Sequence, residues 1–512
     1  MKALHLRLRW RIFALIVMSL LGCNRPVGTG LIQSSVRRDI SDPKDVWIAV
    51  DASAAAGGDG SREHPLRILK DALSSARGRS ILIAPGLYEG PFFCGEATKL
   101  KGPRSAVLFS GGEGAVISAS GGCLLEGLSV QGGAVGVEAR GEDPGRGVSV
   151  QGVAFAGQRR AAITVTSGAL TLEDAELSAS LSESRGVLLQ AGSLGAQIFR
   201  TRFRGPYRVA VEVEPGGGPK RLELSAVQVF DAVSAVRARG PLSVEVQGLA
   251  VDAGRGVALE LFSAHGRMRH LRVSGHEVSL RIGGGSVLEL EDAVFVRPER
   301  AGLEVVKSVV HARDLVVLEA GDYGAVQVVG AALFLERAFL HRTHGDALVV
   351  VDGELSLSDS VMSDSQNPDG ASGAGFQLRR SVARVQSVDV VRPGYVGALV
   401  AEASRVSLSD VVVRGGTLAA LSVETQAFAR GVSLTLLPKD GSAAAISTQG
   451  SLALDAAFFG TPALFADCPS GARLFLGRVR GLDPFASLGA CTGRLIHPLG
   501  LEPPPLPRLG LP

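Results

Sequence analysis

Apolar residues recur in a fixed pattern along most of this chain. The pattern reads apolar, any, apolar, two turn residues, apolar, any, apolar, and it occurs fifteen times between Cys123 and Phe459. One copy consists of Leu222-x-Leu224-xx-Val227-x-Val229. Successive copies start mostly 21 to 26 residues apart, for example at positions 266, 288, 310 and 333. A fixed period in this range is typical of stacked-coil architectures.

Each copy of the pattern is interpreted as two short strands joined by a tight bend, because inward and outward residues alternate along a strand. A third strand follows and often begins at a small residue; examples are Gly186, Ala258, Gly302, Gly324, Ala347, Gly397 and Ala420. Three strands per repeat predict a triangular parallel β-helix, an all-β solenoid of about fifteen coils with roughly 23 residues each.

The repeat divides the chain into segments. Residues 46–122 are expected to form an N-terminal cap and the first coils, residues 123–465 the β-helix, and residues 466–512 a C-terminal cap with a Pro-rich tail. Within the first segment, a helix with Pro65 in its first turn and Leu66, Leu69 and Leu73 on one face is expected to cover the open end. Hydrophobic residues make up 46% of the chain, which is ample for one long core.

The segment before the repeats resembles a known superfamily. The matching residues are Val50-Asp-Ala-Ser, Gly58-Asp-Gly-Ser-x-x-x-Pro65-Leu, Ala72-Leu and Ile81-Leu-Ile-Ala-Pro-Gly-x-Tyr88. They look like the N-terminal part of right-handed parallel β-helix proteins of the pectin-lyase-like superfamily, and the resemblance covers about residues 46–465. It implies a right-handed coil. That superfamily contains lyases, hydrolases, adhesins and members without known activity, so it does not assign a function.

The first 22 residues have the features of an export signal. Basic residues precede an apolar stretch of about ten residues, which is too short for a permanent membrane helix. Leu20-Leu21-Gly22-Cys23 resembles the bacterial lipobox, which implies that Cys23 is lipidated and that residues 23–45 form a tether. The alternative is a plain secretory signal. Asn24 implies, by the same resemblance, sorting to the outer membrane, so the membrane is an expected partner.

The remaining cysteines agree with export. Cys94, Cys123, Cys468 and Cys491 are an even number, and three pairings are open to them. Cys94 with Cys123 and Cys468 with Cys491 lie about one coil apart, within disulfide reach. We therefore predict one disulfide near each end of the solenoid; the alternative is buried free thiols. The net charge of +3 predicts no nucleic-acid partner.

Acidic residues recur at the predicted bend between the first two strands, at Asp174, Asp292, Asp314, Asp359 and Asp410. Asp292 and Asp314 occupy adjacent coils, and Arg313 lies beside them. These three residues are candidates for a catalytic or calcium-binding group, similar to the acidic ligands and basic residue of pectate lyases. The alternative is a structural role, because aspartate bonds to local amides and tolerates the dihedral angles of bends.

Two further clusters are candidate sites. His341, His344 and Asp346 could act as a base with an orienting partner, or bind zinc; the alternative is an exposed turn. Asp364, Asn367 and Asp369 are candidate calcium ligands in a loop. Phe376 stands where an EF-hand needs its closing glutamate, which excludes that motif. No other cofactor is expected.

Two functions fit these observations. The preferred hypothesis is a lipid-anchored cell-envelope β-helix that acts as a non-catalytic binding or structural scaffold, with a glycan or an envelope protein as partner. The alternative is a carbohydrate-active enzyme, such as a polysaccharide lyase or a glycoside hydrolase that acts on acidic glycans. The polygalacturonase motifs of the resembled superfamily are not intact here, and four tyrosines and two tryptophans are few for an extended glycan groove.

Overall fold

The computed structural model is a parallel β-solenoid of about 15 turns with about 23 residues per turn, and the residues that it describes include a single short helix. It describes residues 47–76, 78–141, 147–216, 218, 220–366, 373–437, 444–459, 466–467, 472–476 and 479–480. The predicted all-β fold class is confirmed. Each coil contributes a strand to three faces, and the faces are named first, second and third in chain order.

Strands that belong to one face are short. The first face contains β1 (Trp47–Val50), β2 (Ser80–Ile83), β5 (Lys99–Lys101), β8 (Leu124–Glu126), β11 (Val148–Gln151), β16 (Ser193–Phe199), β27 (Ala332–Glu336), β30 (Glu354–Ser358) and β41 (Arg473–Leu476). The second face contains β3 (Gly86–Glu89), β6 (Ala106–Ser110), β9 (Ser129–Gly132), β12 (Ala154–Ala156), β14 (Glu176–Ser178), β17 (Arg202–Arg204), β28 (Phe339–His341), β31 (Val361–Ser363) and β42 (Val479–Arg480). The third face contains β4 (Phe92–Cys94), β7 (Ala115–Ser120), β10 (Val135–Arg140), β15 (Arg185–Leu189), β18 (Val209–Val213), β22 (Val278–Gly283), β24 (Ala301–Val306), β26 (Val326–Val329), β29 (Leu348–Val351), β32 (Ala374–Arg379), β34 (Val396–Ala401), β36 (Ala419–Val423), β38 (Ala444–Thr448) and β40 (Ala466–Asp467).

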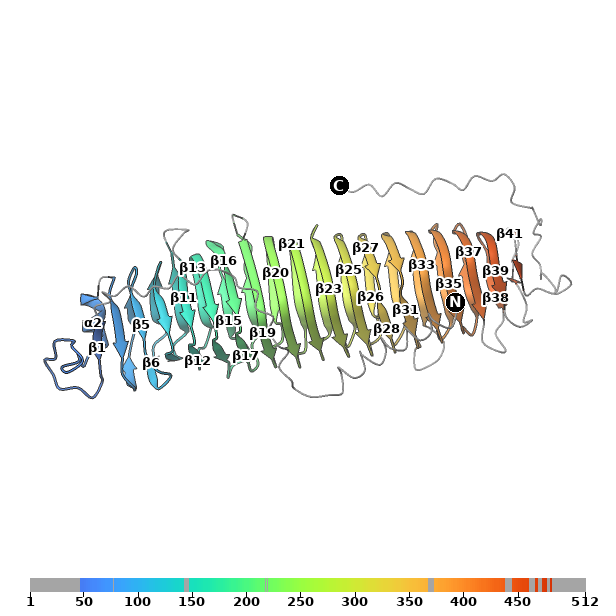
Figure 1. The fold of residues 1–512 in the computed structure, drawn as a ribbon. Coiled ribbons are helices and arrows are strands. Elements are labelled where there is room, and N and C mark those ends of the chain that lie inside the picture. Colours follow the sequence, from blue (N-terminus) through green and yellow to red (C-terminus); the bar gives the residue numbers. More distant parts are fainter. Residues whose placement is uncertain are drawn as a thin grey trace, which may run out of the picture. The chain divides into compact units, whose positions relative to one another are not determined.

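Longer strands continue around a bend and serve more than one face. Seven of them join the first and second faces: β19 (Lys220–Phe230), β23 (Val287–Val296), β25 (Val309–Leu318), β33 (Val382–Val391), β35 (Arg405–Arg414), β37 (Phe428–Leu437) and β39 (Ser451–Phe459). The others are β13 (Ala161–Glu173), β20 (Val236–Asp252) and β21 (Val257–Ser274). Figure 1 shows the coils stacked in sequence order.

The apolar positions of the repeat form the interior. All pairings between successive coils are parallel, and the register places like residues above one another: Leu222 pairs with Val244, and Leu288 with Val310. These side chains are almost fully buried. Burial stabilises the fold by roughly 1.5–3 kcal/mol for each large apolar side chain.

Small residues form a column at the start of the third face, and their size is a packing requirement. Ala258, Ala325 and Ala347 have no exposed surface. A Cβ on Gly375 would lie 2.3 Å from Val390 Cγ1, which belongs to the second face. The column is therefore small because side chains of the preceding strand fill the corner of the triangle.

The bend between the first two faces uses one residue in the left-handed conformation. Asp174, Asp292, Asp314, Asp359 and Asp410 all have φ between 50° and 56° there. Aspartate is among the few side chains that tolerate this region. The structure therefore accounts for the recurrence of aspartate at this bend.

The capping helix is shorter than expected. Helix α2 (Leu69–Ser75) begins after Leu66, because the Leu66 backbone pairs with Ala49 and Asp51 as an isolated bridge. Residue Ile68 is still extended, so Pro65 lies outside the helix. The helix buries Leu69 and packs against β1, β2 and β4.

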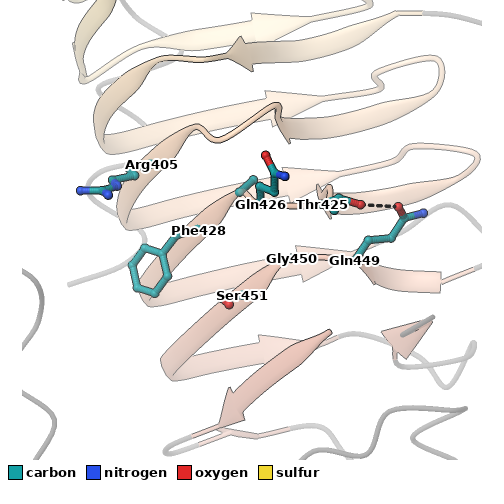
Figure 2. A pocket seen from close by; sticks show the side chains of 8 residues that line it. Arg405, Thr425, Gln426, Phe428, Gln449, Gly450 and Ser451 are labelled. Atoms are coloured by element: carbon teal, nitrogen blue, oxygen red, sulfur yellow. Dashed lines mark hydrogen bonds between the residues drawn. The ribbon is translucent and has the colours of Figure 1, made fainter. Parts of the chain in front are cut away.

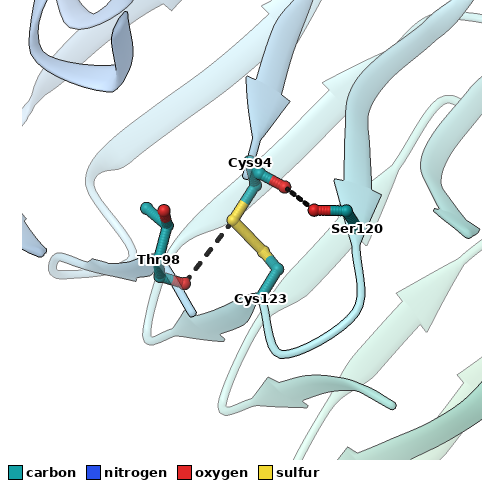
Figure 3. The surroundings of a disulfide bond; sticks show 4 residues. All are labelled: Cys94, Thr98, Ser120 and Cys123. Atoms are coloured by element: carbon teal, nitrogen blue, oxygen red, sulfur yellow. Dashed lines mark hydrogen bonds between the residues drawn. A yellow bond between two sulfur atoms is a disulfide. The ribbon is translucent and has the colours of Figure 1, made fainter. Parts of the chain in front are cut away.

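The N-terminal disulfide prediction is confirmed. Cys94 and Cys123 are bonded, with a Cα–Cα distance of 6.0 Å, and they join β4 to the segment before β8 (Figure 3). The Ser120 hydroxyl donates a hydrogen bond to the Cys94 carbonyl oxygen at 3.3 Å. Cys468 and Cys491 lie outside the described residues.

Candidate functional site

The two candidate aspartates of the first bend are held by different partners. Asp292 Oδ2 lies 2.6 Å from His270 Nδ1 of the preceding coil. Asp314 accepts two hydrogen bonds from Arg337 of the following coil, at 2.7 Å to Nε and 2.6 Å to Nη2. The two carboxylates thus make their side-chain contacts in opposite directions along the column. Each serves to connect neighbouring coils.

The basic residues of this region are also paired between coils. Arg313 Nε donates to Glu336 Oε2 at 3.0 Å, and Arg269 Nε lies 2.9 Å from Glu291 Oε2. These pairs lie on the outer surface of the first face. His276, by contrast, has no exposed surface, and its burial lowers the pKa of the imidazole. His276 therefore adds no charge to the outer surface of these coils.

The structure places His341, His344 and Asp346 in different surroundings. His341 Nδ1 lies 2.8 Å from the Ser363 hydroxyl and 3.4 Å from Asp364 Oδ2, and burial is the main cause that lowers its pKa. His344 is exposed. Asp346 Oδ1 accepts a hydrogen bond from the Ala374 backbone at 2.7 Å, toward the third face.

Asp364 belongs to a bend as well. It has φ of 58° and accepts hydrogen bonds from Arg392 Nε at 2.6 Å and Nη2 at 2.7 Å. These bonds hold the pKa of Asp364 below its usual value. Asn367 and Asp369 lie outside the described residues. Within the part of the chain that the structure describes, no group of three or more His, Cys, Asp or Glu side chains is arranged to hold a metal ion.

A groove of about 330 Å³ lies on the third face, over three successive coils. We call it the Asp346 groove; its lining residues include Asp322, Tyr323, Gln327, Asp346, Val349, Val351, Gln377 and Arg379. The register explains their proximity, because Gln327 pairs with Val349 and Val349 pairs with Gln377. Side chains far apart in sequence therefore meet on one surface.

The polar side chains of the groove form a connected network. The Gln377 amide, oriented to satisfy both neighbours, donates to Asp346 Oδ2 at 2.7 Å and accepts from Arg379 Nη2 at 2.8 Å. Burial raises the pKa of Asp346, and the Ala374 N–H and the Arg379 charge oppose this rise. A half-buried acid, a buried amide and an exposed guanidinium are thus connected by hydrogen bonds.

An aromatic ring forms one wall of the Asp346 groove. Tyr323 is 54% exposed, and the Arg300 guanidinium lies 4.6 Å from the centre of its ring. Gln327 Nε2 donates to the Tyr323 carbonyl oxygen at 2.5 Å. These contacts hold Tyr323 at the groove, and the guanidinium covers part of the ring while the residue stays more than half exposed.

A charged column leads to the groove along the same face. Arg237 Nε lies 3.1 Å from Glu260, and Arg281 Nε lies 2.6 Å from Glu304. The next register position is Gln327. The column therefore changes from ion pairs to neutral side chains where the groove begins.

Sequence reasoning selected Asp346 but missed the residues that surround it. Tyr323, Gln327, Gln377 and Arg379 lie 19 to 33 residues from Asp346, so they belong to other coils and form no local motif with it. These residues could have been found by aligning the sequences of successive repeats, because that alignment places Gln327, Val349 and Gln377 in one column.

A second hollow, of about 450 Å³, lies near the C-terminal coils. Arg405, Thr425, Gln426, Phe428 and Gln449 are among its lining residues, and Figure 2 shows the Thr425 hydroxyl directed at Gln449, to which it donates at 3.2 Å. Of the lining residues, Arg405 alone is ionisable. The lining of this hollow therefore contains no carboxyl group comparable to that of Asp346.

No helix among the described residues has the length and apolar character needed to cross a membrane. No family model matches this chain, and no curated protein sequence matches it.

Two solved structures share a distant likeness with the solenoid. The catalytic unit of a GH87 α-1,3-glucanase from Streptomyces thermodiastaticus strain HF3-3 is 13% identical over 68% of this chain, with a TM-score of 0.29. A GH136 lacto-N-biosidase from Eubacterium ramulus is 9% identical over 69% of this chain, with a TM-score of 0.23. The matches span 65% of each of those chains, less than two thirds of their length. The likeness concerns the fold alone.

Proposed function

We propose that this protein is a lipid-anchored scaffold of the bacterial cell envelope that binds a short glycan in the Asp346 groove without cleaving it. The observation that carries the proposal is the composition of this groove: one exposed aromatic ring, an aliphatic floor and a fixed polar network. Sugar rings present an apolar face and a rim of hydroxyls, and such a lining is complementary to both.

Each part of the groove has a role in this proposal. The Tyr323 ring offers a stacking surface for one sugar face, and Val349 and Val351 contact the C–H groups. Gln377 and Arg379 offer donors and acceptors for hydroxyl groups. A volume of about 330 Å³ suits a mono- or disaccharide unit, in keeping with the small number of aromatic residues in the chain.

The scaffold role is supported by the use of the other candidate carboxylates. Asp292, Asp314 and Asp364 bind basic residues of neighbouring coils at bend positions, which is a structural use. The export signal and the lipobox-like Cys23 support an envelope location and a lipid anchor. A rod tied to a membrane would present the groove to envelope polysaccharide.

Binding to a panel of soluble neutral and uronate oligosaccharides, measured by calorimetry with the full chain in mild detergent, tests the proposal. We expect Tyr323→Ala to weaken binding about tenfold, because a stacking contact contributes about 1–1.5 kcal/mol. Tyr395→Ala is the matched control, since Tyr395 is an exposed tyrosine that does not line the groove. Equal affinities of both variants and the parent protein would place the ligand elsewhere, and no binding to any glycan would refute the proposal.

A second candidate function, glycoside hydrolysis in the same groove, is favoured by one observation. Asp322 and Asp346 both line the groove, and burial raises the pKa of Asp346, as a general acid requires. Incubation with the same oligosaccharides and detection of new reducing ends separates the two functions. Products lost in both Asp346→Asn and Asp322→Asn would favour the hydrolase.

A further inference from the structure

The outer surface of the first face uses its basic residues in two different ways along the solenoid. From β5 to β25, each described lysine or arginine in an outward position of this face forms an ion pair with a carboxylate. The pairs are Lys99 and Lys101 with Glu126, Arg221 with Glu223, Arg267 with Glu289, Arg269 with Glu291, and Arg313 with Glu336. In these coils the protein therefore neutralises its own basic residues.

Three arginines of later coils depart from this arrangement. Arg384 lies in β33, Arg405 in β35 and Arg430 in β37, each in an outward position of the first face. None of them forms an ion pair with another residue that the structure describes, and this includes Glu354 of the preceding coil and Asp410 at the bend. The other outward positions of the first face in these three coils are not acidic; they are Val382, Gln386, Ser407, Ser409, Phe428 and Val432.

The register places the three arginines around one hydroxyl group. Ser407 pairs with Arg384 of the preceding coil and with Arg430 of the following coil. Arg405 lies two residues before Ser407 on the same strand, so its side chain leaves the sheet on the same side. At about 4.8 Å per coil, the Cα atoms of Arg384 and Arg430 are about 10 Å apart. We call Arg384, Arg405 and Arg430 the arginine cluster.

The arginine cluster does not serve the stability of the coils in the way that the earlier pairs do. Like charges on neighbouring strands repel one another. The fold accepts a carboxylate in the same columns, because Glu289 stands in the column of Arg384 and Glu354 in the column of Arg405. A local excess of positive charge attracts anions. The arginine cluster is therefore explained better by an anionic ligand than by the packing of the chain.

The hollow near the C-terminal coils adjoins the arginine cluster. Arg405 belongs to its lining, and Phe428, which pairs with Arg405 from the next coil, belongs to it as well (Figure 2). Thr425, Gln426 and Gln449 add a hydroxyl and two amides to the lining. An aromatic ring with hydroxyl and amide groups nearby is complementary to a sugar, which presents an apolar face and a rim of hydroxyls. The volume of about 450 Å³ leaves room for one sugar beside the arginine cluster.

The number of arginines favours a phosphate monoester over a carboxylate as the anion. A phosphate monoester carries about −1.5 to −2 charges at pH 7 and three strong acceptor oxygens. A carboxylate has one charge and two oxygens, and a single arginine can satisfy both with two parallel hydrogen bonds. Three guanidinium groups thus match the charge and the acceptors of one phosphate group.

We propose that the arginine cluster binds the phosphate group of a sugar phosphate monoester, and that the sugar ring lies in the adjoining hollow against Phe428. The Ser407 hydroxyl, between Arg384 and Arg430, offers a further donor to the phosphate. The proposal is independent of the glycan site, because the arginine cluster lies on the first face and the Asp346 groove on the third.

Calorimetry of the full chain in mild detergent, at about 150 mM salt so that non-specific attraction is screened, tests the site with three probes. We expect glucose 6-phosphate to bind more tightly than inorganic phosphate, because the sugar adds contacts in the hollow. Glucuronate, which offers a carboxylate in place of the phosphate, should bind at least tenfold more weakly than glucose 6-phosphate.

Two variants separate the phosphate from the sugar. Arg430→Gln should weaken binding of both phosphate compounds at least tenfold, because a hydrogen bond to a charged group contributes that much to affinity. Phe428→Ala should weaken glucose 6-phosphate and leave inorganic phosphate unchanged. Arg313→Gln is the matched control, since Arg313 lies on the same face but is paired with Glu336. Circular dichroism checks that all three variants remain folded.

The proposal would be overturned if neither phosphate compound bound, or if Arg430→Gln and Arg313→Gln bound them equally well. Equal affinities for glucuronate and glucose 6-phosphate would also overturn it, because the site would then not distinguish a phosphate from a carboxylate. A Phe428→Ala chain that bound glucose 6-phosphate like the parent protein would contradict the position of the sugar in the hollow.

Discussion

The column of small residues at the start of the third face leads to a specific prediction for Gly375. This residue lies in β32, the strand that carries Gln377 and Arg379 of the Asp346 groove. We expect Gly375→Ala to destabilise the coils around β32. Its φ does not lie in the left-handed region, so the effect tests packing and not backbone strain.

The magnitude follows from two distances. A Cβ on Gly375 would lie 2.3 Å from Val390 Cγ1 and 2.6 Å from the Gly397 carbonyl oxygen. Ordinary contacts begin near 3.4 Å, so Val390 must move by about 1 Å, and the oxygen belongs to a paired backbone. Overpacking of this kind costs about 1–3 kcal/mol, and contact with the backbone places the estimate in the upper half of that range.

Hydrogen exchange followed by mass spectrometry is the suitable assay, because a solenoid can open locally. We expect about 30- to 150-fold faster exchange in peptides that contain β29, β32 and β34, with distant coils unchanged. Gly111→Ala is the matched control, because no atom lies within 4 Å of its added Cβ and its φ is also outside the left-handed region. It should be neutral or slightly stabilising.

The reasoning would be refuted if the Gly375→Ala chain exchanged at the same rates as the Gly111→Ala chain. Uniform destabilisation of all coils would also contradict it, since the clash concerns one corner of one coil.

Three other predictions concern the disulfide, the Asp346 carboxyl and the anchor. Replacing both Cys94 and Cys123 by serine should destabilise the first coils by about 3.6 kcal/mol for a loop of 29 residues, measured by local exchange; an unchanged rate would contradict this. Burial raises the pKa of Asp346 above 3.8, so the folded state keeps this proton longer, and stability falls as the pH rises from about 4 through the raised pKa. Asp346→Asn should remove that decrease in urea unfolding measured from pH 3.5 to 7, and an identical slope would disprove the assignment. Cys23→Ser should move the protein out of the membrane fraction, and unchanged fractionation would exclude lipidation there.

The fold was accessible from the sequence because its information is local and repeated. The spacing of apolar residues in Leu222-x-Leu224-xx-Val227-x-Val229 specifies two strand segments with inward-facing apolar residues and the bend between them. Later coils repeat the same spacing. The helix boundary was predicted less well. Leu66 has the apolar character of a helix face, yet its backbone pairs with Ala49 and Asp51, which only the folded neighbourhood reveals.

The candidate sites were harder to predict, since chemistry depends on which side chains meet. His341 and Asp346 are five residues apart, but one contacts Ser363 at a bend and the other faces the third-face groove. Asp292 and Asp314 occupy adjacent coils as expected, but each pairs away from the other. Proximity in sequence or in coil number does not determine the direction of a side chain.

The amino-acid sequence by itself determined the parallel β-solenoid, the bend aspartates and the pairing of Cys94 with Cys123, because each depends on the period of the repeat. Only the tertiary structure decided that Tyr323, Asp346 and Gln377 line one groove. The physical reason is the register between coils. Insertions of a few residues change the spacing between repeats, and the register alone decides which outward side chains stand above one another.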